Sequence, residues 1–219
     1  MEMLHERFLA GVAAERRRLS RRSVMTGSVK LAAGAALALS FASTPSVRRL
    51  VVAQELKSNL YVLNYALTLE HLESAFYRDG VDLFTFGNDS RGTSIDTNFA
   101  AIRDHEAEHV TTLTKVITDL GGTPVEPATY NFGDAYDDPK AFLQTAMALE
   151  NTGVKAYDGA AQFISDADLL TAAGSIVAVE ARHASYLNLL NGEVPFPDAF
   201  EMPLSPEEVL KIAGQFIAS

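Results

Sequence analysis

Four segments of this chain carry apolar residues at the helical spacing of about 3.6 residues, and a glutamate interrupts each apolar stripe near its middle. In two of the stripes a histidine follows the glutamate three residues later. An ionised glutamate is rarely buried without a partner, so these inward-facing carboxylates require a compensating cation. Two divalent metal ions would balance four carboxylates. The interrupting residues are Glu70, Glu106 with His109, Glu150, and Glu180 with His183.

The stripes predict an all-α fold with long helices over residues 48–79, 96–120, from 138 to a turn near Ser165, and 166–191. Gly80, Gly121 and Gly192 follow three of these segments as stop signals. Ser94 or Asp96 is the expected cap of the second helix, and Asp138–Pro139 begins the third. A short C-terminal helix is expected from Ser205, where a capping box precedes Pro206. No long stretch shows the alternation of a strand.

The connections predict the topology. The turn near Ser165 is short, so the third and fourth helices are antiparallel neighbours. The polar, Gly/Pro-rich link over 122–138 can span about 50 Å, more than the length of a 25-residue helix, about 37 Å. We therefore expect a four-helix bundle with a long crossover between helices two and three. Phe84 and Phe86 in the 80–95 loop are expected to pin that loop to the bundle.

An internal repeat divides the bundle into two similar halves. Residues 69–77 align with 149–157, and each Glu-x-x-His pair is followed by a leucine four residues later. Helix positions i and i+3 project on one face, about 5–6 Å apart. Glu106 with His109 can therefore bind one ion and Glu180 with His183 another, while Glu70 and Glu150 bridge the ions or bind one each.

Oxygen and nitrogen ligands without sulfur suit Fe(II), Mn(II) or Zn(II), and the chain has no cysteine. One Glu-x-x-His arises by chance in many helices, but two of them with two symmetry-matched glutamates form a specific pattern. The alternative is a degenerate site of protonated or water-bridged carboxylates. Clustered glutamates without metal would repel one another and have raised pKa values.

Several neighbours of these residues have structural interpretations. Glu73 lies one turn from Glu70, but its repeat partner is Gly153, so we expect it to flank the site rather than to be a ligand. His71 and His105 face away from the stripes and are expected at the surface.

Tyr77 and Tyr157 lie two turns beyond the lone glutamates of their stripes. Core packing is the expected role of both rings. A hydrogen bond to a metal ligand, or participation in redox chemistry, is the alternative.

Residues 1–45 have the pattern of an export leader. Arg16–Arg18 and Arg21–Arg22 precede an apolar stretch over 31–42 that ends in small residues. That stretch, about a dozen residues, is short for a membrane-spanning helix. Residues 20–25 resemble a twin-arginine signal, although Val24, Met25 and Thr26 depart from its usual residues. An uncleaved anchor or a mis-assigned start codon is the alternative.

The bundle domain is then expected over 46–219, in the periplasm, the cell envelope or outside the cell, with only transient membrane contact through the leader. The whole chain has a formal net charge of −10, and its basic cluster lies in the leader. So acidic a domain argues against a nucleic-acid partner, which would need a basic face.

Four stretches resemble the ferritin-like superfamily, and more narrowly the exported ferritin-like domain family that includes desiccation-related proteins. They are Ala66–Glu73, His105–His109, Ala148–Tyr157 and Val179–His183, within a match over about 50–190. The resemblance implies a four-helix bundle with a dinuclear site whose ligands are Glu70, Glu106, His109, Glu150, Glu180 and His183. It does not imply one activity, because the superfamily contains ferroxidases, peroxidases, manganese catalases, oxygenases and members without demonstrated chemistry.

The functional prediction is an exported di-metal carboxylate protein, with iron or manganese, that carries out oxidoreductase chemistry on O2 or peroxide. The alternative is a non-enzymatic envelope protein related to stress or desiccation, in which the metal site is structural or degenerate. A further alternative is a homo-oligomer, such as an iron-storage shell, although no feature of the sequence specifies one. No motif indicates a nucleotide, flavin or haem site.

Overall fold

The computed structural model describes residues 58–218, and this part of the chain is all-helical. The described elements include four long helices and a short one: α4 (Asn59–Gly80), α5 (Ile95–Asp119), α6 (Pro139–Ala161), α7 (Ala167–Leu190) and α8 (Pro206–Ala213). The 3-10 helices Val81–Leu83, Gly133–Tyr136 and Gly214–Phe216 complete them. The all-α prediction is confirmed. The predicted leader, residues 1–45, lies outside the described residues.

The first helix begins later than predicted. Ser58 has an extended backbone (φ −126°, ψ 146°), and its side chain accepts a hydrogen bond from the Tyr61 amide, so it caps α4. An unbroken helix over 48–79 is therefore wrong at Ser58, because periodicity does not detect a cap between two apolar stretches. Residues 48–57 lie outside the described part of the chain.

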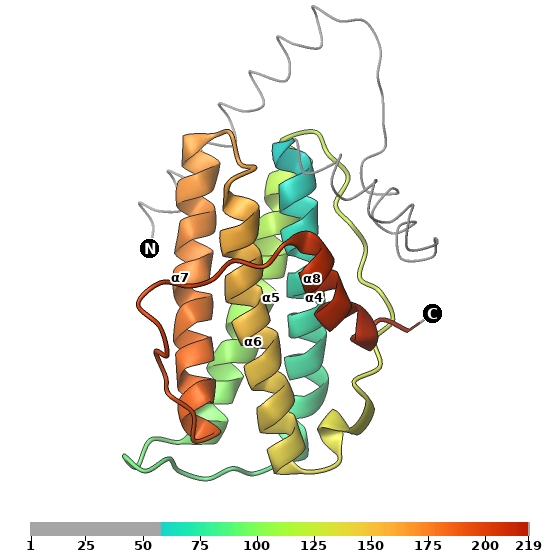
Figure 1. Cartoon of the computed structure of the whole chain (residues 1–219). Helices are drawn as coiled ribbons and strands as arrows, with labels where there is room; N and C mark the ends of the chain where they lie inside the picture. Colours follow the sequence, from blue (N-terminus) through green and yellow to red (C-terminus); the bar gives the residue numbers. More distant parts are fainter. Residues whose placement is uncertain (1–57, 219) are drawn as a thin grey trace, which may run out of the picture.

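The long helices form a bundle of two antiparallel pairs. In Figure 1, α4 and α5 form one pair and α6 and α7 the other, and these two pairings make the most extensive helix contacts. The segment after α5 runs the length of the bundle before α6 begins, so α5 and α6 are parallel (Figure 1). This confirms the predicted crossover. α8 lies across the bundle and packs on α6.

Side-chain caps begin the helices at the predicted positions. Asp138 accepts hydrogen bonds from the amides of Lys140 and Ala141, and Ser205 forms a capping box with Glu208. Ser94, rather than Asp96, caps α5. Asp96 instead accepts hydrogen bonds from the amides of Phe86 and Gly87 and thereby fixes the preceding loop.

The core is aromatic at the end of the bundle where α4 ends and α6 begins. Phe142, fully buried, stacks on Phe76 with ring centroids 4.8 Å apart, and Phe99 meets Phe142 edge-on. Phe84 and Phe86 pack against this cluster, as predicted for the loop. The opposite end of the bundle is aliphatic, with Leu, Ile and Val side chains from α4, α5 and α7. The middle of the bundle, where the stripes are interrupted, is therefore enclosed by apolar side chains.

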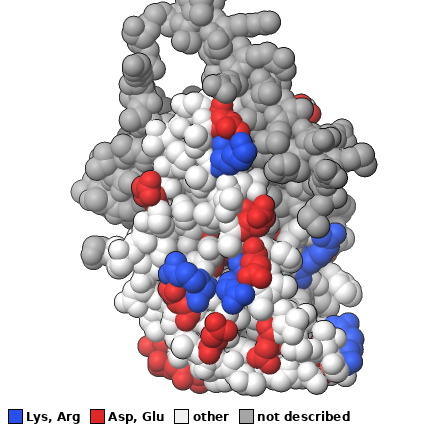
Figure 2. Space-filling view, turned by 180° about the vertical axis from the view of Figure 1, so that it is seen from behind, with Lys and Arg blue, Asp and Glu red and all other residues white. Residues whose placement is uncertain are grey.

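On the face shown in Figure 2, acidic and basic side chains are interspersed on a largely uncharged surface. No helix among residues 58–218 is both long and apolar enough to span a bilayer.

Candidate metal centre

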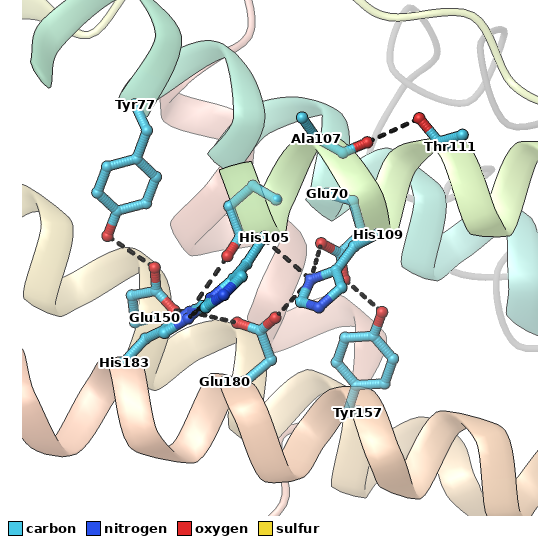
Figure 3. Close-up of polar contacts among 11 residues, drawn as sticks. Glu70, Tyr77, His105, Ala107, His109, Thr111, Glu150, Tyr157, Glu180 and His183 are labelled. Carbon is cyan, nitrogen blue, oxygen red and sulfur yellow. Dashed lines mark hydrogen bonds and ion pairs between the residues drawn. The ribbon is translucent and has the colours of Figure 1, made fainter. Parts of the chain in front are cut away.

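The six predicted ligands converge in the middle of the bundle (Figure 3). Each helix contributes what the repeat predicts: α4 and α6 one glutamate each, and α5 and α7 one glutamate and one histidine each. All four glutamates are 0% exposed, and the two histidines are 6–9% exposed. The residues concerned are Glu70, Glu106, His109, Glu150, Glu180 and His183.

Two overlapping groups of four residues have ligand atoms that all lie within 4.8 Å of one another. In the first group, His109 Nδ1 lies 3.2 Å from Glu70 Oε2, 3.3 Å from Glu106 Oε2 and 2.9 Å from Glu180 Oε1. We call this group the His109 position; its members are Glu70, Glu106, His109 and Glu180.

The second group, which we call the His183 position, consists of Glu106, Glu150, Glu180 and His183. Here His183 Nδ1 lies 3.2 Å from Glu106 Oε1, 3.2 Å from Glu150 Oε2 and 4.0 Å from Glu180 Oε2. Glu106 and Glu180 belong to both positions, whereas Glu70 and Glu150 belong to one each. Of the two arrangements that the sequence left open, this geometry favours the one in which the glutamates of α5 and α7 lie between the ions.

The carboxylates are incompletely satisfied by the protein. Glu106 Oε1 and both oxygens of Glu180 accept no hydrogen bond in good geometry, although Glu180 Oε1 lies 2.9 Å from His109 Nδ1. A buried acceptor without a donor is costly, and a buried charge without a partner more so. Each of these three oxygens lies within 4.0 Å of a histidine Nδ1 in the His109 or the His183 position, without forming a hydrogen bond. A cation bound there would satisfy them.

Burial and repulsion disturb the ionisation of the cluster. Burial and neighbouring carboxylates raise the pKa of Glu106 to about 7 and that of Glu180 well above its usual value. Burial also raises the pKa of Glu150. Burial opposes the charged form of Glu70 too, but hydrogen bonds and the charge of His109 outweigh it and lower its pKa. Without metal, the protein therefore holds protons in this cluster.

The histidines respond in the opposite direction. Burial alone would lower their pKa values, but hydrogen bonds with the glutamates outweigh it. The pKa of His183 rises to about 10, and that of His109 rises well above its usual value. In the metal-free protein the protonated imidazoles then provide the positive charge that metal ions would otherwise supply. The same donor set of carboxylate oxygens and imidazole nitrogens, without sulfur, suits divalent iron, manganese or zinc.

Two tyrosines hold the lone glutamates from across the bundle. The Tyr77 hydroxyl on α4 donates to Glu150 Oε1 at 2.6 Å, and the Tyr157 hydroxyl on α6 donates to Glu70 Oε1 (Figure 3). Both rings are buried, as core packing predicted, but the alternative of a hydrogen bond to a candidate ligand also holds. Burial and the nearby carboxylates raise the pKa of each tyrosine, which keeps the hydroxyl a donor.

His105 makes a contact that the sequence interpretation missed. It is exposed, as predicted, yet its Nδ1 lies 3.0 Å from Nε2 of His183. The rings are nearly coplanar, with an interplanar angle of 7° and centroids 5.2 Å apart, which is the geometry of an in-plane hydrogen bond. Position 105 lies off the apolar stripe, so periodicity gave no signal. His71 instead contacts the crossover, with Nε2 3.1 Å from the Val125 carbonyl oxygen.

A comparison with curated proteins finds no match to this chain. A family model described as the ferritin-like domain matches residues 58–193. This range exceeds half of the chain and contains the four long helices with all the candidate ligands. The family, the helical bundle and the buried Glu/His cluster agree with one another. The chain therefore belongs to the ferritin-like domain family.

Proposed function

We propose that the protein binds two divalent metal ions, one at the His109 position and one at the His183 position. The observation that carries this proposal is the pair of four-residue groups that share Glu106 and Glu180, with every glutamate fully buried. Glu106 and Glu180 would bridge the ions, Glu70 and Glu150 would each bind one, and the histidines would bind through Nδ1.

Charge balance supports two ions rather than one. The four glutamates carry a charge of −4 when ionised, which two divalent cations neutralise inside an apolar enclosure. The raised pKa of Glu106 indicates that the metal-free cluster retains protons, and the metal ions would displace them. The ions would also bind the oxygens of Glu106 and Glu180 that accept no hydrogen bond. Iron and manganese both accept this donor set.

We propose further that the centre is an oxidoreductase site for O2 or peroxide. A bound pair of iron or manganese ions would supply the redox chemistry. The protein would orient the ligands and enclose the centre. Tyr77 and Tyr157 would orient the lone glutamates, and His105 would orient His183. The apolar clusters above and below the centre limit the entry of water.

The proposed location is outside the cytoplasm, reached by the twin-arginine route that residues 1–45 resemble. That route carries folded proteins, so metal would be loaded before export. This part of the proposal rests on the sequence alone. It predicts that a fusion of residues 1–45 to a reporter is exported, and that replacing Arg21 and Arg22 by lysine stops export.

The first experiment is elemental analysis of protein purified without chelators, followed by anaerobic titration with Fe(II) or Mn(II). We expect about two ions per chain. Glu106→Ala and Glu180→Ala should each abolish binding at both positions, because each residue belongs to both groups. Glu108→Ala on the exposed face of α5 is the matched control and should bind as the wild type does. Failure of the wild type to take up metal would contradict the proposal.

Turnover then separates the two functional alternatives. An oxidoreductase consumes O2 or decomposes peroxide when loaded with iron or manganese. A stress-related structural protein would gain stability from the same metals without turnover, since an ion that binds only the folded state raises the free energy of unfolding.

A further inference from the structure

The internal repeat is broken at two positions beside the metal centre. The candidate ligands and the two tyrosines all have repeat partners of the same type. His105, however, aligns with Val179, and Glu73 aligns with Gly153. Near a site that is otherwise pseudo-twofold, such differences make the two halves chemically unequal.

The first difference concerns the nitrogen of His183 that faces away from the carboxylates. When Nδ1 binds a metal, Nε2 carries the proton and can donate it to His105 Nδ1, 3.0 Å away and in the plane of the ring. Such a contact fixes the ring and increases the basicity of the ligand. For His109, the corresponding residue on α7 is Val179, whose side chain has no acceptor.

The second difference places an additional carboxylate beside the centre. Glu73 is 3% exposed. Among residues 58–218 no hydrogen bond or ion pair involves its side chain. A Cβ added to Gly153 would lie 2.9 Å from Glu73 Oε1 and 3.7 Å from Glu180 Oε2. The Glu73 carboxylate thus fills the space that a side chain at 153 would take, next to Glu180.

Both differences favour the same half of the centre. His105 contacts His183, which belongs only to the His183 position. The Cβ position at Gly153 that Glu73 Oε1 approaches lies 3.7 Å from Glu180 Oε2. This oxygen is the one 4.0 Å from His183 Nδ1, whereas the other oxygen of Glu180 lies beside His109. An additional buried carboxylate strengthens the field that attracts a cation, and its own burial without a partner is relieved when a cation binds.

We infer that the two metal positions are unequal: the His183 position binds its ion more tightly and fills first, with Glu73 as an additional carboxylate for that ion and His105 as the positioning residue of His183. This inference rests on the proposed function, because it assumes that metal binds at both positions. Its consequence is a protein that holds one ion firmly and exchanges the other.

The test is an anaerobic titration of the metal-free, full-length protein with Co(II), followed by calorimetry and by the visible absorption of the bound ion. We expect two binding events whose dissociation constants differ at least tenfold. His183→Ala should remove the tighter event and His109→Ala the weaker one, because each histidine belongs to one position.

His105→Ala should then weaken the tighter event about 10- to 100-fold, the usual effect of losing such a partner, and leave the weaker event unchanged. His105→Asn should restore most of the affinity, because its side-chain oxygen can accept near the place of Nδ1. Val179→Ala is the control from the other half. Combined with His183→Ala, the His105→Ala change should have no further effect.

Glu73→Gln provides a second test that keeps the volume of the side chain. It should also weaken the tighter event, and Gly153→Ala should act in the same direction by displacing the Glu73 carboxylate. Two events of equal affinity in the wild type, or equal effects of His105→Ala on both events, would overturn this inference alone. No binding of Co(II) at all would overturn the proposed function as well.

Discussion

Tyr77 and Tyr157 make the same contact twice, each from its own helix to the lone glutamate of the opposite one. The hydroxyl of Tyr157 donates a hydrogen bond to Glu70 of the His109 position, and the hydroxyl of Tyr77 donates one to Glu150 of the His183 position. A hydrogen bond of this kind orients a carboxylate for metal binding, and its loss typically lowers metal affinity.

We predict that Tyr157→Phe and Tyr77→Phe each weaken metal binding about tenfold or more, at different positions. Tyr157→Phe should affect the event that His109→Ala removes, and Tyr77→Phe the event that His183→Ala removes. Calorimetric titration with Co(II) measures both, and each variant is the control for the other. Equal weakening of both events by one variant would contradict this assignment.

The residues of the site divide into those that the sequence revealed and those that it did not. All six candidate ligands lie on the stripes, and the structure brings them together in one buried cluster; that they bind metal stays a prediction. A stripe shows which face a side chain takes but not which opposing side chain it meets. The contacts of Tyr77 with Glu150 and of His105 with His183 depend on how two helices are aligned along their axes, which the periodicity of each single helix does not reveal.

At the scale of the helices, packing rather than backbone conformation requires a glycine at position 80, the last residue of α4. The sequence interpretation treated it as a conformational stop. Its φ is −108°, which any residue can adopt, so conformation does not require glycine. A Cβ at Gly80 would instead lie 2.5 Å from Tyr136 and 2.6 Å from Phe142. The aromatic cluster requires the absence of a side chain there.

Gly80→Ala should therefore lower the free energy of unfolding by about 1–3 kcal/mol, the usual effect of overpacking. Gly174→Ala is the matched control: the residue is exposed in the middle of α7, and nothing lies within 4 Å of an added Cβ. That change should raise the free energy of unfolding by about 0.5–1 kcal/mol, because alanine favours the helix. Urea unfolding followed by circular dichroism measures both changes. An unchanged free energy of unfolding in Gly80→Ala would contradict the prediction, because it would mean that the aromatic rings move aside for the added methyl group.

The boundaries of the elements were predicted within a residue or two where a cap or a glycine marks them. α5 was expected over 96–120 and runs Ile95–Asp119, and α7 was expected over 166–191 and runs Ala167–Leu190. The start of α4 was missed because Ser58 interrupts a region that is apolar on both sides.

For the whole molecule, the buried cluster links stability to pH. Relative to ordinary values of 4.5 and 6.5, the pKa of Glu106 rises to about 7 and that of His183 to about 10. The folded protein thus binds these protons more tightly than the unfolded chain does, so its stability falls as pH rises through these ranges. The lowered pKa of Glu70 acts in the opposite direction, but only below its ordinary value of 4.5.

We predict that the melting temperature of the metal-free protein falls between pH 5 and pH 10, as measured by calorimetry. Glu106→Gln, which cannot lose a proton, should reduce the decline between pH 5 and pH 7. The metal-loaded protein should lack most of the decline, because the ions replace the protons. A metal-free protein that becomes more stable from pH 5 to pH 8 would contradict the directions of these shifts.

Because of the long crossover between α5 and α6, bound ions would affect the conformational entropy of the unfolded chain. Each position takes three ligands from one helical hairpin and one glutamate from the other, so neither hairpin can complete a position alone. In the sequence, Glu106 in α5 precedes the crossover and Glu180 in α7 follows it. A bound ion would therefore close a long loop between distant parts of the chain, and a cross-link of that kind removes many conformations from the unfolded state. In this fold the metal ions would act as reversible cross-links between the two helical hairpins, and these cross-links would form only after the hairpins have packed together.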